Sequence, residues 1–184
     1  HARFKVFLQD GLPRFCGGLA GYFGYDTIRY IEPRLAKNSL PDEINTPDIQ
    51  LMLTEELAVI DNLAGKLYLI VYANPQEPAS YDAAEKRLKE LLASLDAPVK
   101  KPSNSASSKT EAIRRFGKAE FMDAVKRTKE YILAGDCMQV VIGQRISQPF
   151  SDSPLSLYRA LRSLNPSPYM YLYDFGDHQI VGSS

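Results

Sequence analysis

Two prolines separated by a single serine, Pro166 and Pro168, constrain the fold of this chain more than any other feature of its sequence. A proline fixes its φ at about −65° and holds the residue before it in an extended conformation. Because an apolar, aromatic stretch follows at once, we expect a stiff elbow between a helix that ends near Leu164 and a strand over Tyr169–Phe175. Such an elbow can hold a small amphipathic ligand, although on its residues alone a plain helix-to-strand connector is the simpler interpretation.

The remaining hydrophobic pattern predicts antiparallel strands and amphipathic helices. Short stretches rich in Leu, Ile, Val and Tyr predict strands, and apolar stripes at helical spacing predict three helices. The first expected strand is Leu19–Phe23, which we expect to be buried, and an expected hairpin joins Gln50–Asp61 to Lys66–Ala73. The other expected strands are Met138–Ser147, Tyr169–Phe175 and Gln179–Gly182. The expected helices are Ser80–Leu95, Gly117–Ala134 and Asp152 to Leu164. The expected fold class is α+β, with largely antiparallel β-sheets and helices packed between and around them.

A change in composition divides the chain. Residues 98–109 are rich in Ser, Lys and Pro and show no apolar periodicity, so we expect an exposed linker there. The expected organisation is part of an N-terminal domain over residues 1–97, a flexible linker over 98–115 and the beginning of a second domain over 116–184.

Charge and cysteine usage exclude several classes of function. Lys+Arg and Asp+Glu balance at 22 each, so no global field draws the chain to nucleic acid or to an anionic membrane, and no apolar run approaches the length of a membrane span. Cys16 and Cys137 lack a Cys-x-x-Cys spacing, which favours the cytoplasm and argues against a zinc site. His178 lies beside an expected turn, where we expect a solvated surface group. No catalytic or metal-binding set of residues can be assembled from the sequence alone.

Four segments together resemble a known family. They are Asn-Pro-Ser-Pro-Tyr-Met at 165–170, Gly-Gly-Leu-Ala-Gly-Tyr-Phe-Gly-Tyr-Asp at 17–26, Gly-Asp-Cys-Met-Gln-Val-Val at 135–141 and Ile-Val-Gly-Ser-Ser at 180–184. They are similar to segments of the large subunit (component I) of anthranilate synthases, in the chorismate-utilising enzyme family. Because members of that family are roughly three domain lengths long, we expect this chain to be an internal fragment that lacks the C-terminal catalytic half.

The resemblance implies an activity, a cofactor and partners for the complete enzyme. It would convert chorismate and ammonia to anthranilate and pyruvate in tryptophan biosynthesis, in the cytoplasm and with Mg²⁺. A glutamine amidotransferase subunit (component II) would supply the ammonia from glutamine. The resemblance places the family's metal ligands and its chorismate contacts outside this chain, so we assign no metal ligand here and expect the fragment alone to be inactive.

The resemblance also implies a regulatory site at the elbow, where L-tryptophan would bind as a feedback inhibitor. Pro168, Tyr169 and Met170 would line one wall of this site, and Asn165 and Pro166 would shape the elbow. An aromatic ring and a polarizable thioether suit an indole.

One catalytic position is carried over by resemblance, at Gln139 in the strand expected over Met138–Ser147. Related chorismate enzymes that use water or form a covalent adduct have a lysine at this position. A lysine can deprotonate water or attack carbon, whereas a glutamine amide can only orient a nucleophile through hydrogen bonds. Gln139 therefore favours ammonia as the nucleophile, although without the resemblance it is an ordinary strand residue.

Two alternatives remain open. The first is aminodeoxychorismate synthase component I, which Gln139 disfavours. The second belongs to another class of function, a non-catalytic regulatory module that binds an amino acid.

Overall fold

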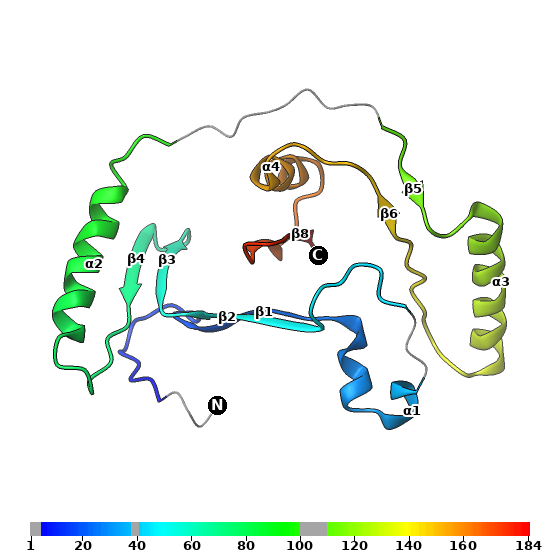
Figure 1. The fold of residues 1–184 in the computed structure, drawn as a ribbon, viewed down its shortest axis with the longest axis horizontal. Coiled ribbons are helices and arrows are strands. Elements are labelled where there is room, and N and C mark those ends of the chain that lie inside the picture. The colour runs from blue at the N-terminus through cyan, green and yellow to red at the C-terminus, as the bar shows by residue number, and fades with distance from the viewer. Residues whose placement is uncertain (1–4, 38–40, 100–109) are drawn as a thin grey trace. The chain divides into compact units, whose positions relative to one another are not determined.

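The computed structural model describes residues 5–37, 41–99 and 110–184, and the chain divides into two units, His1–Val99 and Lys100–Ser184 (Figure 1). Each unit combines helices with small antiparallel sheets, which confirms the expected α+β class. The linker expected over 98–115 lies largely outside the described residues. No helix in the described part of the chain is both long and apolar enough to cross a membrane.

A close pair of strands forms the first sheet of the N-terminal unit. β1 (Gly18–Phe23) pairs antiparallel with β2 (Ile49–Thr54), with Gly21 opposite Leu51. A Cβ added at Gly21 would overlap the carbonyl oxygen of Gln50 and lie 2.9 Å from the Cα of Leu51. This approach of the two backbones therefore requires a glycine.

The expected hairpin forms between β3 (Glu56–Asp61) and β4 (Lys66–Val71). Its turn is fixed by the Asp61 carboxylate, which accepts hydrogen bonds from the backbone N–H groups of Leu63 and Ala64 at 3.0 and 2.9 Å. The single strand expected over Gln50–Asp61 is wrong, because the chain changes its pairing partner at Glu55, from β1 to β4. The hydrophobic pattern runs through Glu55 without a turn signal, so the sequence does not show this division.

Two short helical segments, η1 (Tyr25–Tyr30) and α1 (Pro33–Ala36), follow β1. The sequence analysis does not predict them because they lack an apolar stripe of useful length. η1 is tied to the segment before β2, since the Tyr30 hydroxyl donates to the Asp48 carboxylate at 2.6 Å.

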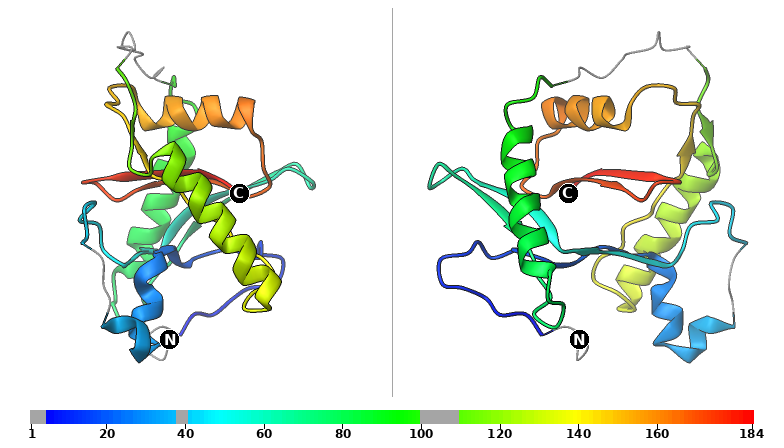
Figure 2. Two further views of the ribbon diagram at one scale, coloured as in Figure 1. Left: turned by 90° about the vertical axis from the view of Figure 1, so that its right-hand side faces the viewer. Right: turned by 60° about the vertical axis from the view of Figure 1, so that its left-hand side comes forward.

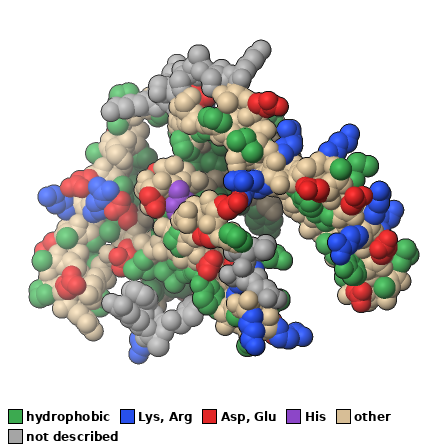
Figure 3. All heavy atoms as spheres, turned by 45° about the vertical axis from the view of Figure 1, so that its right-hand side comes forward, with side chains coloured by type: hydrophobic (Ala, Val, Ile, Leu, Met, Phe, Trp, Pro, Cys, Tyr) green, Lys and Arg blue, Asp and Glu red, His purple; other side chains and the backbone are tan. Residues whose placement is uncertain are grey.

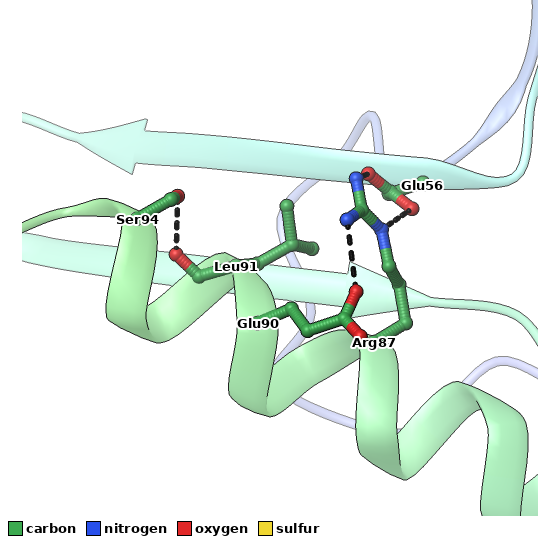
Figure 4. Close-up of polar contacts among 5 residues, drawn as sticks. All are labelled: Glu56, Arg87, Glu90, Leu91 and Ser94. Carbon is green, nitrogen blue, oxygen red and sulfur yellow. Dashed lines mark hydrogen bonds and ion pairs between the residues drawn. The ribbon is translucent and has the colours of Figure 1, made fainter. Parts of the chain in front are cut away.

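The long helix of this unit, α2 (Ser80–Ser94), contacts β4 and matches the expected helix closely (Figure 1). Arg87 links α2 to β3, because its Nε and Nη2 each lie 2.7 Å from the Glu56 carboxylate (Figure 4). Its Nη1 donates to Glu90 at 3.2 Å. The hydrogen bonds from Arg87 to Glu56 hold the pKa of Glu56 below its ordinary value. All three side chains are exposed, so the contribution to stability is modest.

Two helices and two small sheets are the regular elements of the described part of the C-terminal unit. β5 (Ile113–Arg114) pairs with β6 (Ile146–Ser147), and β7 (Met170–Asp174) pairs with β8 (Gln179–Ser183). The two helices are α3 (Lys118–Ala134), which is followed by its C-cap Gly135 with φ +84°, and α4 (Pro154–Leu164), which is preceded by its N-cap Ser153. Both views of Figure 2 show α4 (orange) beside the β7–β8 hairpin (red), which it contacts through both strands.

The strand expected over Met138–Ser147 is mostly wrong. Only its last two residues form a strand, β6, and residues 138–145 are irregular. A strand is stable only when its backbone groups pair with a neighbour, and no strand in the described part of the chain runs beside these residues. Met138 and Val141 are accordingly 98% and 85% exposed.

Little apolar surface is buried in the part of the chain that the structure describes. Cys16, at 7% exposure, is the one buried apolar side chain of this part. Leu19 and Phe23 of β1 are more than half exposed, so the expectation that β1 is a buried strand is wrong. Figure 3 shows hydrophobic side chains (green) among charged ones over the visible surface. The apolar faces that predict the helices and strands therefore remain largely uncovered within this chain.

Candidate functional site

The elbow follows α4 directly and has the geometry that its two prolines require. The backbone N–H of Asn165 donates to the carbonyl of Leu161 at 2.8 Å and closes the last helical turn. Asn165 itself then leaves the helix, with φ −141° and ψ 68°, and so avoids the α region that a following proline disfavours. Strand β7 begins at Met170, so residues 165–169 form a short connection between helix and strand.

Hydroxyl groups of two serines join this elbow to the end of β8. The Ser183 Oγ donates to the carbonyl oxygen of Asn165 at 2.7 Å. The Ser167 Oγ donates to the carbonyl oxygen of Ser184 and accepts from the backbone N–H of Tyr169 at 3.0 Å. The backbone N–H of Ser184 in turn donates to the carbonyl of Tyr169 at 3.2 Å. We call Ser167 and Ser183 the serine clasp.

The elbow leaves an aromatic side chain uncovered. Tyr169 is 75% exposed, Pro168 is exposed, and Met170 is half-buried opposite Ser183 in the β7–β8 ladder. The residues expected to line the tryptophan site are thus held in one short, anchored segment, but their role in binding stays a prediction. An exposed tyrosine beside a thioether offers surface that an aromatic ligand can cover.

An aromatic row runs along β7 in the hairpin that follows the elbow. The ring centroids of Tyr171 and Tyr173 lie 5.2 Å apart in a stacked arrangement, and Phe175 continues the row at 5.9 Å from Tyr173. Gly182 lies opposite Tyr171, whose ring occupies the space that a Cβ at Gly182 would need. Such pairs stabilise the hairpin beyond their area burial.

His178 ends this row rather than standing in solvent. Its ring centroid lies 5.2 Å from that of Phe175, and its side chain is only 21% exposed, so the expected solvated position is wrong. Its Nδ1 lies 2.8 Å from the Asp177 carboxylate, and this hydrogen bond lowers the pKa of Asp177. The sequence analysis expects the turn between β7 and β8, but it does not predict that the His178 ring packs against Phe175 across that turn.

Gln139 lies in the irregular segment before β6 and is exposed. It is therefore not placed on a strand, in contrast to the expectation from its sequence. Its expected role in orienting the nucleophile stays a prediction.

The described residues offer little for metal chemistry. They contain no group of three or more His, Cys, Asp or Glu side chains that could hold a metal ion, and Cys16 and Cys137 are both free thiols.

The serine clasp is the feature of the site that the sequence analysis misses. A hydroxyl between two prolines is a local turn signal, so Ser167 could have been singled out. Ser183 could not, because its bond to Asn165 joins residues 18 positions apart and depends on the fold.

Comparisons with known proteins agree on one family. Residues 2–184 match the model of the chorismate binding enzymes. The chain is 54% identical over 187 residues to anthranilate synthase component 1 of Neisseria meningitidis serogroup B and 50% identical over 188 residues to that of Pseudomonas aeruginosa. Each alignment covers 100% of this chain and 38% of the relative, so the chain spans well under half of their length.

A solved structure shows the same fold. The chain is similar to the crystal structure of anthranilate synthase component I from Streptococcus pneumoniae, with a TM-score of 0.79 and 34% sequence identity. That similarity covers 98% of this chain and 41% of the other.

Proposed function

Because this chain belongs to the family of chorismate binding enzymes, we propose that it is part of an anthranilate synthase component 1, which converts chorismate and ammonia to anthranilate and pyruvate. The observation that carries the proposal is the identity of 54% and 50% to component 1 proteins across the whole chain. The relatives reported above carry this name, so the aminodeoxychorismate alternative is not favoured.

The complete enzyme would act in tryptophan biosynthesis, in the cytoplasm, with Mg²⁺ and with a glutamine amidotransferase partner that delivers ammonia. These parts of the proposal rest on the resemblance and on the names of the relatives. Gln139 would orient the incoming ammonia, because an amide can hydrogen-bond a nucleophile but cannot act as a base or attack carbon.

Tryptophan would inhibit the enzyme by binding at the elbow formed by residues 165–170. Support comes from the anchored geometry of this segment and from the exposed ring of Tyr169 beside Met170. A rigid segment loses little conformational entropy when it binds a ligand, which favours affinity.

The test of the activity uses the complete protein, chorismate, Mg²⁺ and ammonium, with the appearance of fluorescent anthranilate as the readout. We expect anthranilate to form and L-tryptophan to suppress it. Turnover without suppression would remove the regulatory part of the proposal alone, whereas consumption of chorismate without anthranilate would remove the proposal as a whole.

A further inference from the structure

We propose that the serine clasp, Ser167 and Ser183, couples the elbow to the β7–β8 hairpin, so that tryptophan bound at the elbow alters the binding of chorismate. Both serines are positioning residues in this proposal, since neither needs to touch tryptophan or chorismate. The inference rests on the proposed function, in which the elbow binds tryptophan.

The first step concerns how the elbow is anchored. Pro166 and Pro168 have no backbone N–H. Two of the five residues between helix and strand therefore cannot donate a backbone hydrogen bond to a neighbouring strand. The N–H of Tyr169 bonds to the Ser167 Oγ, and the carbonyl of Asn165 accepts from the Ser183 Oγ. Hydrogen bonds of serine hydroxyls therefore hold the elbow in place, where hydrogen bonds between backbone groups would do so in a regular strand.

The second step concerns what a displaced elbow would move. Because each proline fixes its φ, the elbow cannot absorb a displacement by rotating at these positions. The Ser167 Oγ and the carbonyl of Tyr169 both bond to Ser184, and the Ser183 Oγ bonds to Asn165. A shift of the elbow is thus passed to the end of β8 at three points.

The third step concerns the receiving element. β8 pairs with β7 over its whole length, so the backbone ladder makes the hairpin one element, and the rings of Tyr171 and Tyr173 stack along β7. A stiff element shifts as a body rather than deforming locally. The hairpin belongs to the residues that match the chorismate binding enzymes, and in this proposal its displacement changes the affinity of the complete enzyme for chorismate.

The experiment measures coupling separately from affinity in the complete protein. The dissociation constant of tryptophan is obtained by calorimetry, and the KM for chorismate is measured without tryptophan and at saturating tryptophan. The ratio of the two KM values reports the coupling between the sites. The variants are Ser183→Ala and Ser167→Ala, and Ser183→Thr retains a hydroxyl as a rescue.

Ser163→Ala is the matched control. Its Oγ donates to the carbonyl of Arg159 at 3.1 Å, within α4 itself, so it is also a serine near the elbow that bonds to backbone, but it joins no second element. A general effect of losing a serine hydroxyl would appear in this variant too.

We expect Ser183→Ala to bind tryptophan within about twofold of the parent and to lose about fivefold in the KM ratio, the effect of one hydrogen bond of ordinary strength. Ser167→Ala is expected to lose a similar factor, while Ser183→Thr and Ser163→Ala keep the parent ratio. If both alanine variants have the same KM ratio as the parent, the proposed role of the clasp is wrong and the proposed function is unaffected. Absence of tryptophan binding in the parent would overturn the clasp and the regulatory part of the proposed function, and would leave the proposed formation of anthranilate standing. If Ser183→Ala fails to fold, Ser167→Ala alone decides the outcome.

Discussion

The exposed apolar surface of this chain predicts how it behaves when it is separated from the rest of a longer protein. Its accessible surface is 15996 Å². Two separately folded domains, each with half of its 20.6 kDa, would together expose about 10,700 Å². The chain thus exposes about 5,300 Å² more than self-contained domains of its mass.

That excess is large on the scale of protein stability. If somewhat more than half of it is apolar, as on ordinary protein surfaces, covering it would contribute on the order of 75 kcal/mol as an upper bound, at about 25 cal/mol per Å². Net stabilities of whole proteins are only about 5–15 kcal/mol. We therefore expect that residues 1–184 alone do not form a cooperatively folded protein.

The assay compares the isolated 184-residue chain with the complete protein. Differential scanning calorimetry is expected to show no cooperative transition for the isolated chain, and the dye ANS to bind it strongly. The complete protein serves as the control and is expected to unfold cooperatively without binding ANS. A transition of about 130 kcal/mol in the isolated chain, the enthalpy of a fully packed protein of this length, would refute the reasoning.

Four further outcomes are expected. The isolated chain forms no fluorescent anthranilate from chorismate, Mg²⁺ and ammonium. In the complete protein, Gln139→Lys lowers kcat/KM with ammonia by roughly tenfold or more, as expected when an orienting group is lost, and an unchanged value contradicts its assignment. Met170→Thr or Pro168→Ala relaxes tryptophan inhibition while turnover without tryptophan persists, measured as the inhibitor concentration for half activity. Arg87→Gln raises the pKa of Glu56 toward its ordinary value in an NMR titration. Because that pKa is lowered in the folded chain, the Arg87–Glu56 pair stabilises the fold at pH values above the ordinary pKa of Glu56, and this stabilisation is lost as the pH falls through the lowered pKa.

Helices are the part of this fold that the sequence predicts best, because their ends carry local signals. Ser153 followed by Pro154 marks the start of α4, where the Ser153 Oγ accepts from the N–H of Leu155 at 3.2 Å. Gly135 marks the end of α3 with a left-handed φ. Such signals depend only on neighbouring residues, so they survive without the rest of a fold.

Strands and the site are predicted less completely, because they depend on distant partners. The stretch 138–145 has the composition of a strand but lacks a pairing neighbour among the described residues, and Gln50–Asp61 changes partner at Glu55. The prolines and the resemblance predict residues 165–170 as part of the site. The sequence does not predict the hydrogen bond from Ser183 to Asn165, because this bond requires the packing of β8 beside the elbow.

The most direct test of the central claim identifies the products that the complete protein makes from chorismate, ammonium and Mg²⁺. Chromatography with mass spectrometry separates anthranilate from aminodeoxychorismate, and a coupled lactate dehydrogenase assay counts pyruvate. We predict anthranilate and pyruvate in equal amounts. Aminodeoxychorismate without pyruvate would contradict the assignment and favour the alternative, and chorismate left unchanged would contradict an enzymatic role.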